Sequence, residues 1–157
     1  MHPSNERVVR AAAAAGLCIV VESFPEGTRT AEDAAKAIGC PVGAIAKSLV
    51  LDSDRGPVVV LTSGENRLDF GKVATALEVE GVGRADAERA REATGYPIGG
   101  TAPFGHPERL PILFDRDLLA YQTVWAAAGT PKTVFAANPE ELAKAAGAKV
   151  AEVAQGR

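Results

Sequence analysis

The sequence predicts an α+β protein, folded as one domain over residues 1–157, in which helices surround a mixed, largely antiparallel sheet. A chain of 157 residues can bury one core, and its 46% hydrophobic and 24% charged residues are typical of a globular protein. Short β-branched runs alternate with helical segments, but two pairs of neighbouring runs are joined by tight turns. These hairpins favour α+β over strict βαβ alternation.

Polar residues followed by helix-type segments predict five helices, several of which end at a glycine. A side-chain oxygen at the start accepts a free backbone N–H, and glycine adopts the left-handed conformation that ends a helix. The expected helices are 4–15 with Ser4 or Asn5 as cap, 31–39 after Thr30, 67–78, 86–95 with Asp86 as cap, and 139–147 after Asn138. A single helical turn is expected at 117–121.

Runs of β-branched and aromatic residues predict the strands. Segments 45–51 and 57–63 flank a turn-rich stretch and predict one hairpin. A second hairpin is expected around Gly129 to Pro131. Single strands are expected at 18–23, 79–84 and 110–115, with a final strand or tail at 148–153.

Charge argues against a protein that coats nucleic acid, because 17 basic and 20 acidic residues give a net charge of −3. A local basic face stays possible. Its candidate members all fall in the first half of the chain: Arg7, Arg10, Lys36, Lys47, Arg67 and Lys72.

Cys18 and Cys40 have no metal-type spacing and lie in apolar surroundings, so we expect free, buried thiols in a reducing compartment. The two histidines belong to no zinc pattern, and we expect neither metal nor cofactor. The apolar stretch 11–21 is too short to cross a bilayer and is followed by Glu22. We therefore expect a cytoplasmic protein with no membrane partner.

Lys47 is the first candidate for chemistry. Side chains alternate along a strand, so Lys47 shares a face with Ile45 and Leu49. An ammonium group on an apolar face needs an anionic or polar partner, which a ligand could supply. The alternative is that its long side chain reaches solvent from the end of the strand.

The loop 95–107, GYPIGGTAPFGHP, is the second candidate. It carries four glycines, three prolines and no charge. Gly99 and Gly100 allow a close approach of the backbone to a ligand, and the prolines stiffen the path. Backbone N–H groups here and at Thr101 could hold a carbonyl oxygen or oxyanion. The alternative is a rigid connector packed over the sheet.

Weaker candidates lie at two junctions. The stretch SGENRLD places Asn66, Arg67 and Asp69 where a strand meets a helix, although Asp69 is explained more simply as a helix cap. The small residues 126–128 leave space beside the sheet or fill its core. His106 follows a glycine and precedes a proline in the loop, and we see no order of residues typical of a catalytic triad.

Four stretches together resemble the YbaK/prolyl-tRNA synthetase-associated domain family of aminoacyl-tRNA deacylases: AKSLVL, SGENRLD, TGYPIGGTAPFGHP and WAAAGTPKTVFAANPEELAKAAGAKVAEV. The similarity runs from TRTAEDAAKAIG to the end of the chain. A strand lysine combined with a GGxxPxG loop is specific, although each alone is weak. The GTPK tip looks like the free-standing branch of the family rather than the insert of prolyl-tRNA synthetase.

The resemblance implies a sheet partly closed as a barrel and an enzyme that hydrolyses the ester of mischarged tRNA in trans, with tRNA(Pro) carrying a small non-cognate amino acid as the expected substrate. It makes Lys47 the pocket lysine and Gly100 the glycine whose backbone faces the ester carbonyl. The expected partners are the acceptor end of aminoacyl-tRNA and prolyl-tRNA synthetase. The candidate substrate-binding residues are Thr30, Ser63, Asn66, Gly99, Thr101, Pro103, Ala127 and Gly129.

Two other functions stay open. The loop could dock a nucleic acid or a synthetase in a non-catalytic regulatory module, although such a module has no need to place a lysine on an apolar face. A hydrolase of small free esters is the second alternative. The source of a general base and the amino acid removed are not indicated.

Overall fold

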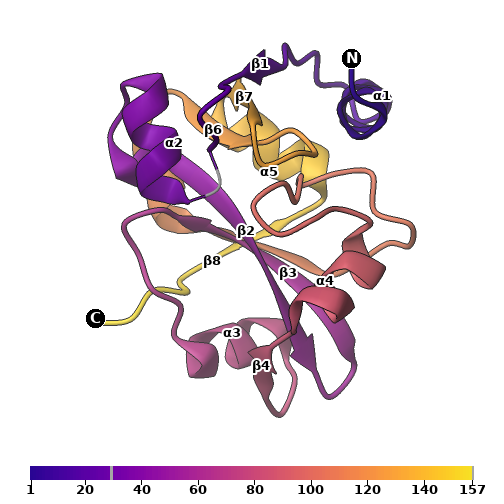
Figure 1. The fold of residues 1–157 in the computed structure, drawn as a ribbon. Coiled ribbons are helices and arrows are strands. Elements are labelled where there is room, and N and C mark those ends of the chain that lie inside the picture. Colours follow the sequence, from indigo (N-terminus) through magenta and orange to yellow (C-terminus); the bar gives the residue numbers. More distant parts are fainter. Residues whose placement is uncertain (29, 157) are drawn as a thin grey trace.

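The centre of the fold is the hairpin of β2 (Ile45–Ser53) and β3 (Gly56–Ser63), which confirms the first predicted hairpin. The computed structural model describes residues 1–28 and 30–156. Figure 1 shows this hairpin running diagonally through the molecule, with helices placed around it.

One mixed sheet joins the strands in the order β1–β7–β6–β2–β3–β5–β8, with β4 paired to β2 beside this path. The pairs β2–β6, β3–β5 and β5–β8 are parallel and the other four are antiparallel, so parallel pairing is more frequent than expected. No pairing among the described residues joins β1 to β8, and partial closure as a barrel stays a prediction. The remaining strands are β1 (Glu22–Ser23), β4 (Val82–Arg84), β5 (Ile112–Asp115), β6 (Val124–Ala127), β7 (Thr133–Ala137) and β8 (Lys149–Ala151).

The two edges of β2 are paired differently. On one edge, β3 pairs with β2 from Ala46 to Ser53. On the other edge, β6 pairs only with Ile45 and Ala46, and β4 pairs only with Leu51 to Ser53. Among the described residues, no strand pairs with residues 47–50 on this edge, so the sheet has a gap there.

The helices confirm most of the predicted caps. Thr30, Asp69, Asp86 and Asn138 each accept a backbone N–H at the start of a helix. Glycines 39, 95 and 147 end three helices in the left-handed conformation. The helices are α1 (Pro3–Ala14), α2 (Ala31–Ile38), α3 (Phe70–Leu77), α4 (Ala87–Thr94) and α5 (Pro139–Ala146), with 3₁₀ turns η1 (Val42–Ala44) and η2 (Arg116–Ala120).

Three expectations near the amino terminus were wrong in detail. The first helix is capped by His2, whose Nδ1 accepts the Ser4 N–H at 3.0 Å, rather than by Ser4 or Asn5. The strand expected at 18–23 pairs only at Glu22 and Ser23, because only the end of β7 lies beside it. Cys18 is exposed and Cys40 half-buried, so these free thiols are not the buried pair expected. Burial raises the pKa of the Cys40 thiol.

Both faces of the sheet are covered. Val59 and Leu61 of β3 pack into one core with Phe114 and Phe135, whereas Val58 and Val60 pack into a second core on the opposite face. Consecutive residues of a strand that is buried on both faces are apolar, which explains the sequence PVVVL. None of the described helices is both long and apolar enough to cross a membrane.

Candidate active site

A cavity of about 50 Å³ lies beside β2, where α2, β6 and the loop 95–107 meet that strand. Five of the predicted site residues line it, and they come from four separate parts of the chain: Thr30, Lys47, Gly99, Thr101 and Ala127. The other five lie outside its lining: Ser63, Asn66, Gly100, Pro103 and Gly129. The fold therefore brings half of the predicted site together.

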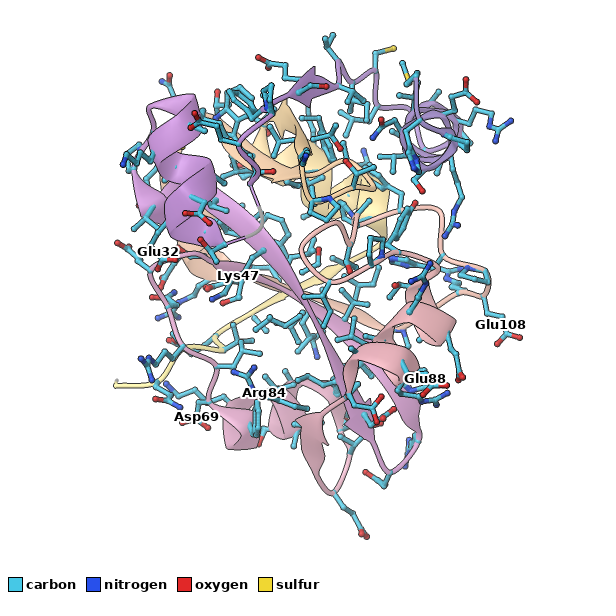
Figure 2. The ribbon with its side chains drawn as sticks, viewed as in Figure 1. Glu32, Lys47, Asp69, Arg84, Glu88 and Glu108 are labelled. Atoms are coloured by element: carbon cyan, nitrogen blue, oxygen red, sulfur yellow. The ribbon has the colours of Figure 1, made fainter. Side chains whose placement is uncertain are left out.

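Lys47 carries the one charged side chain among the described residues of the cavity lining. It is half-buried and takes part in none of the described ion pairs. Figure 2 shows Lys47 on β2 with Glu32 of α2 nearby, but Glu32 borders a larger neighbouring hollow and not the cavity. The Lys47 ammonium is thus available to an anionic or polar group of a ligand.

The rest of the lining is mostly small and apolar. Ala31 and Ala34 lie one turn apart on the buried side of α2, and Thr30 caps the start of this helix with its hydroxyl. Trp125 and Ala127 contribute from β6. This wall suits a small apolar group and offers no carboxylate to it.

The loop presents Gly99 and Thr101 to the cavity, whereas Gly100 is turned away. The Gly100 N–H donates to the Pro97 carbonyl at 3.0 Å, so it is not free for an ester carbonyl. A Cβ at position 100 would lie 2.8 Å from backbone atoms of Thr130, which explains why glycine is needed there. In the part of the chain described, no hydrogen bond uses the N–H of Gly99 or Thr101. These two N–H groups, rather than that of Gly100, are the available donors.

Arg7 of α1 donates hydrogen bonds to both ends of this loop. Its Nε donates to the Gly105 carbonyl at 2.6 Å and its Nη2 to the Thr94 carbonyl at 2.7 Å. Its guanidinium also stacks over the Tyr96 ring, with Cζ 4.3 Å from the ring centre. The Tyr96 hydroxyl in turn donates to the Phe104 carbonyl at 2.7 Å. This network, together with the burial of Tyr96 and Phe104 in the core, holds the uncharged loop in shape.

The same helix fixes the tip of the β6–β7 hairpin, on the other side of the cavity. Asn5 is buried, and its Nδ2 donates to the Ala128 carbonyl at 2.6 Å and to Thr133 Oγ1 at 2.9 Å. Gly129 has a φ of +105°, and a Cβ there would lie 2.8 Å from the Ser4 carbonyl oxygen. Gly129 thus serves the packing of the tip against α1.

Ser63 and Asn66 belong to a buried network around Asp115. Asp115 Oδ2 accepts from the Ser63 N–H at 3.0 Å and from Asn66 Nδ2 at 2.9 Å, and Thr62 Oγ1 adds a third bond at 3.2 Å. The Ser63 hydroxyl donates to the Gly43 carbonyl. These side chains join β3 to β5 and lie outside the cavity lining, although Asn66 also lines the larger neighbouring hollow. Their role in substrate binding stays a prediction.

Pro103 and His106 border a different hollow, behind the loop. His106 Nε2 lies 2.9 Å from the Ala102 carbonyl, which requires the ring proton on this nitrogen. Burial lowers the pKa of His106, the Ala102 carbonyl partly offsets this, and Arg7 lowers the pKa further. Neither residue reaches the cavity lining.

A larger hollow of about 1020 Å³ adjoins the cavity, and Lys47 lines both. The exposed side chains of Arg67, Phe70, Arg84 and Ile98 border it. Arg84 and Asp69 both border this hollow, and Figure 2 shows them near α3. Two members of the possible basic face are engaged within the fold, because Arg7 binds the loop and Lys72 Nζ donates to the Ala154 carbonyl.

Sequence reasoning missed Ser48, Trp125 and Thr28, which also line the cavity. Because side chains alternate along a strand, Ser48 is expected on the face opposite Lys47. Both residues nevertheless border the cavity, because the cavity opens at the edge of the strand rather than on one face. A strand edge has no periodic signal in the sequence, so only the pairing of β2 reveals it.

Comparison with known proteins gives one consistent result. A family model described as "Aminoacyl-tRNA editing domain" matches residues 25–145. A solved structure described as "a putative trans-editing enzyme for prolyl tRNA synthetase" is 44% identical, with a TM-score of 0.92 over 99% of both chains. Two curated relatives match over 83% of this chain: "Uncharacterized protein YwhH" of Bacillus subtilis (30% identical, 83% of its own length) and "Putative Cys-tRNA(Pro)/Cys-tRNA(Cys) deacylase EbsC" of Enterococcus faecalis (27% identical, 80% of its length).

Replacing Arg7 tests whether α1 sets the loop. Arg7→Lys keeps the charge but loses the forked geometry that bonds two carbonyl groups at once. We expect it to lower the free energy of unfolding by about 1–3 kcal/mol, since a partly buried carbonyl loses its donor. Urea denaturation measures this. Arg10→Lys is the control because Arg10 is exposed on the same helix. Equal stability of the two variants would contradict the role of Arg7.

Proposed function

The chain belongs to the aminoacyl-tRNA editing domain family, and we propose that it is a trans-editing deacylase that hydrolyses the ester of mischarged tRNA. The proposed substrate is tRNA(Pro) carrying a small non-cognate amino acid, in line with the descriptions of the structural neighbour and of the Enterococcus faecalis relative. Prolyl-tRNA synthetase as a partner and a cytoplasmic location belong to the same proposal.

The observation that carries the proposal is the cavity itself. It combines the Lys47 ammonium and two loop N–H groups, none of which has a partner among the described residues, with a small apolar wall. An aminoacyl ester has the matching parts: a carbonyl that gains negative charge during hydrolysis and a side chain that must fit the wall. Fixed donors around a developing oxyanion are a strong source of rate enhancement.

In the proposed reaction, water attacks the ester carbonyl carbon and the bond from this carbon to the ribose oxygen breaks. The ribose oxygen takes a proton, which leaves a free amino acid and a tRNA with a free terminal hydroxyl. The N–H groups of Gly99 and Thr101 stabilise the oxyanion, and Lys47 orients the ester oxygens or a nearby phosphate. The described lining holds no carboxylate or imidazole to act as base, so the ribose hydroxyl of the substrate is the group proposed to assist.

The size of the cavity supports selection for small side chains. A volume of about 50 Å³ holds a few water-sized groups at most. A synthetase pocket distinguishes side chains that differ by one methylene by only about 1–3 kcal/mol, so a second site with its own shape corrects its errors. We propose that Ala31, Ala34 and Ala127 form the wall that accepts the wrong amino acid.

The larger hollow is the proposed place for the acceptor end of the tRNA. It adjoins the cavity at Lys47, so an ester bound in the cavity leaves its nucleotide in this hollow. Arg67 and Arg84 can approach phosphates, and Phe70 offers an aromatic face to a base. A hydrolase of small free esters has no use for these residues.

Loss of Lys47 tests the assignment of the site. We expect Lys47→Ala to lower kcat/KM by at least about 100-fold, the usual effect of removing one charge-stabilising donor. The assay follows hydrolysis of tRNA(Pro) carrying Ala, Ser, Thr, Cys or Pro. Lys36→Ala is the control, because Lys36 is exposed on α2 outside the cavity. Full activity of Lys47→Ala would remove Lys47 from the mechanism, and an inactive wild type would favour the binding module.

Substitutions in the hollow separate a tRNA deacylase from a hydrolase of free esters. Arg67→Gln and Arg84→Gln should each raise KM for aminoacyl-tRNA several-fold, because each variant loses one phosphate contact. The slope of log KM against log salt concentration should fall by about one for each. Neither should change hydrolysis of the methyl ester of the same amino acid. Arg89→Gln is the matched control, because Arg89 lies outside the hollow. Unchanged kinetics on tRNA would argue that the hollow does not hold the acceptor end.

A further inference from the structure

The gap in the sheet leaves one residue of β2 with backbone groups that face no strand. The Ile45 carbonyl accepts from the Gly64 N–H on the β3 side. Neighbouring strand residues direct their backbone groups to opposite edges, so Lys47 and Leu49 also face β3, whereas Ala46, Ser48 and Val50 face the other edge. Val50 confirms this alternation, because its carbonyl accepts from the Ala85 N–H at 3.3 Å beside β4.

Ser48 therefore lies at the centre of the gap. Ala46 pairs with β6 on this edge and Val50 bonds to Ala85, but no described residue pairs there with Ser48. The N–H and the carbonyl of Ser48 point together toward the open edge, as in any strand residue. Ser48 also lines the cavity, and Gly99 and Thr101 of the loop line it with Ser48.

The Ser48 hydroxyl gives a second, independent sign of a missing ligand. Among the described residues, Ser48 Oγ is the one buried side-chain oxygen or nitrogen with no hydrogen-bond partner. The other hydroxyls of the lining are engaged, since Thr28 bonds to the Pro131 carbonyl, Thr30 caps α2 and Thr101 bonds to the Pro97 carbonyl. Buried polar groups are nearly always satisfied in folded proteins, so an exception beside a cavity calls for a partner from outside.

We propose that the open edge of β2 at Ser48 binds the aminoacyl group of the substrate as a one-residue strand, an inference that rests on the proposed deacylase function. The α-amino group donates to the Ser48 carbonyl and hydroxyl oxygens, and the ester carbonyl accepts from the Ser48 N–H. An extended aminoacyl group presents its amine and its carbonyl to the same side, which is how a residue pairs in an antiparallel sheet.

This pairing agrees with the chemistry of the cavity. The described lining contains no carboxylate, so an α-amino group that enters it needs neutral acceptors, and Ser48 offers two. A carbonyl oxygen accepts two hydrogen bonds, so the bound ester carbonyl can use the Ser48 N–H and one loop N–H together. The oxyanion that forms from it has three lone pairs and can accept from Ser48 and from both loop N–H groups. Ser48 thereby recognises what all aminoacyl groups share, and the alanine wall is left to select the side chain.

The first test compares two serines of the same strand. The Ser53 hydroxyl donates to the Gly56 carbonyl, whereas the Ser48 hydroxyl has no partner in the described part of the chain. Ser48→Ala should keep or raise Tm, by roughly 2 °C, and lower kcat/KM about tenfold. Ser53→Ala should lower Tm and leave kcat/KM unchanged. A clear loss of Tm in Ser48→Ala would assign its hydroxyl a structural role and overturn the proposal.

The second test identifies the group that Ser48 contacts. The substrate is the aminoacyl-tRNA(Pro) that the wild type hydrolyses fastest, together with its counterpart in which hydrogen replaces the α-amino group. Ser48→Ala should slow hydrolysis of the first about tenfold and of the second less than twofold. Equal slowing of both, or no slowing of either, would overturn the contact between Ser48 and the amine while deacylation by the wild type stands. A wild type that hydrolyses no aminoacyl-tRNA would overturn the proposed function as well.

Discussion

The interrupted pairing of β2 is the constraint on which the site depends. A strand at the centre of a sheet is normally bonded along both edges, and β2 is bonded along the whole of one edge but only at the two ends of the other. The short strands β6 and β4 close the sheet on either side of the gap, so backbone groups stay available without leaving a long open edge that could aggregate. The cavity, the lysine and the unpartnered serine all lie at this gap.

Rigidity around the gap comes from α1, an element remote from the chemistry. This helix holds the loop through Arg7 and the hairpin tip through Asn5, and the loop touches the tip where Gly100 meets the Thr130 backbone. The loop and the hairpin tip, which lie next to cavity-lining residues, are therefore both fixed to α1. Donors held in place before the substrate arrives lose little further freedom during the reaction, which is the physical advantage of a preorganised site.

The sequence predicted local structure well because caps and hairpin turns act over a few residues. Thr30, Asp86 and Asn138 begin helices as expected, and the strand lysine lines the cavity. Side-chain partners far apart in sequence were not predictable. Asn66 donates to Asp115, which lies 49 residues away in sequence, and the Gly100 N–H donates to the Pro97 carbonyl within a turn. Nothing in local composition distinguishes a polar residue that binds substrate from one that joins two strands.

Amide hydrogen exchange tests the central claim, that the gap in β2 is where the aminoacyl group binds, most directly. The ligand is an aminoacyl adenosine in which an amide replaces the ester, so that it binds without being hydrolysed. The account predicts slower exchange at the N–H groups of Ser48, Gly99 and Thr101 on binding, with little change at Gly100, whose N–H is already bonded to Pro97. Protection confined to other parts of the chain, with Ser48 unaffected, would contradict it.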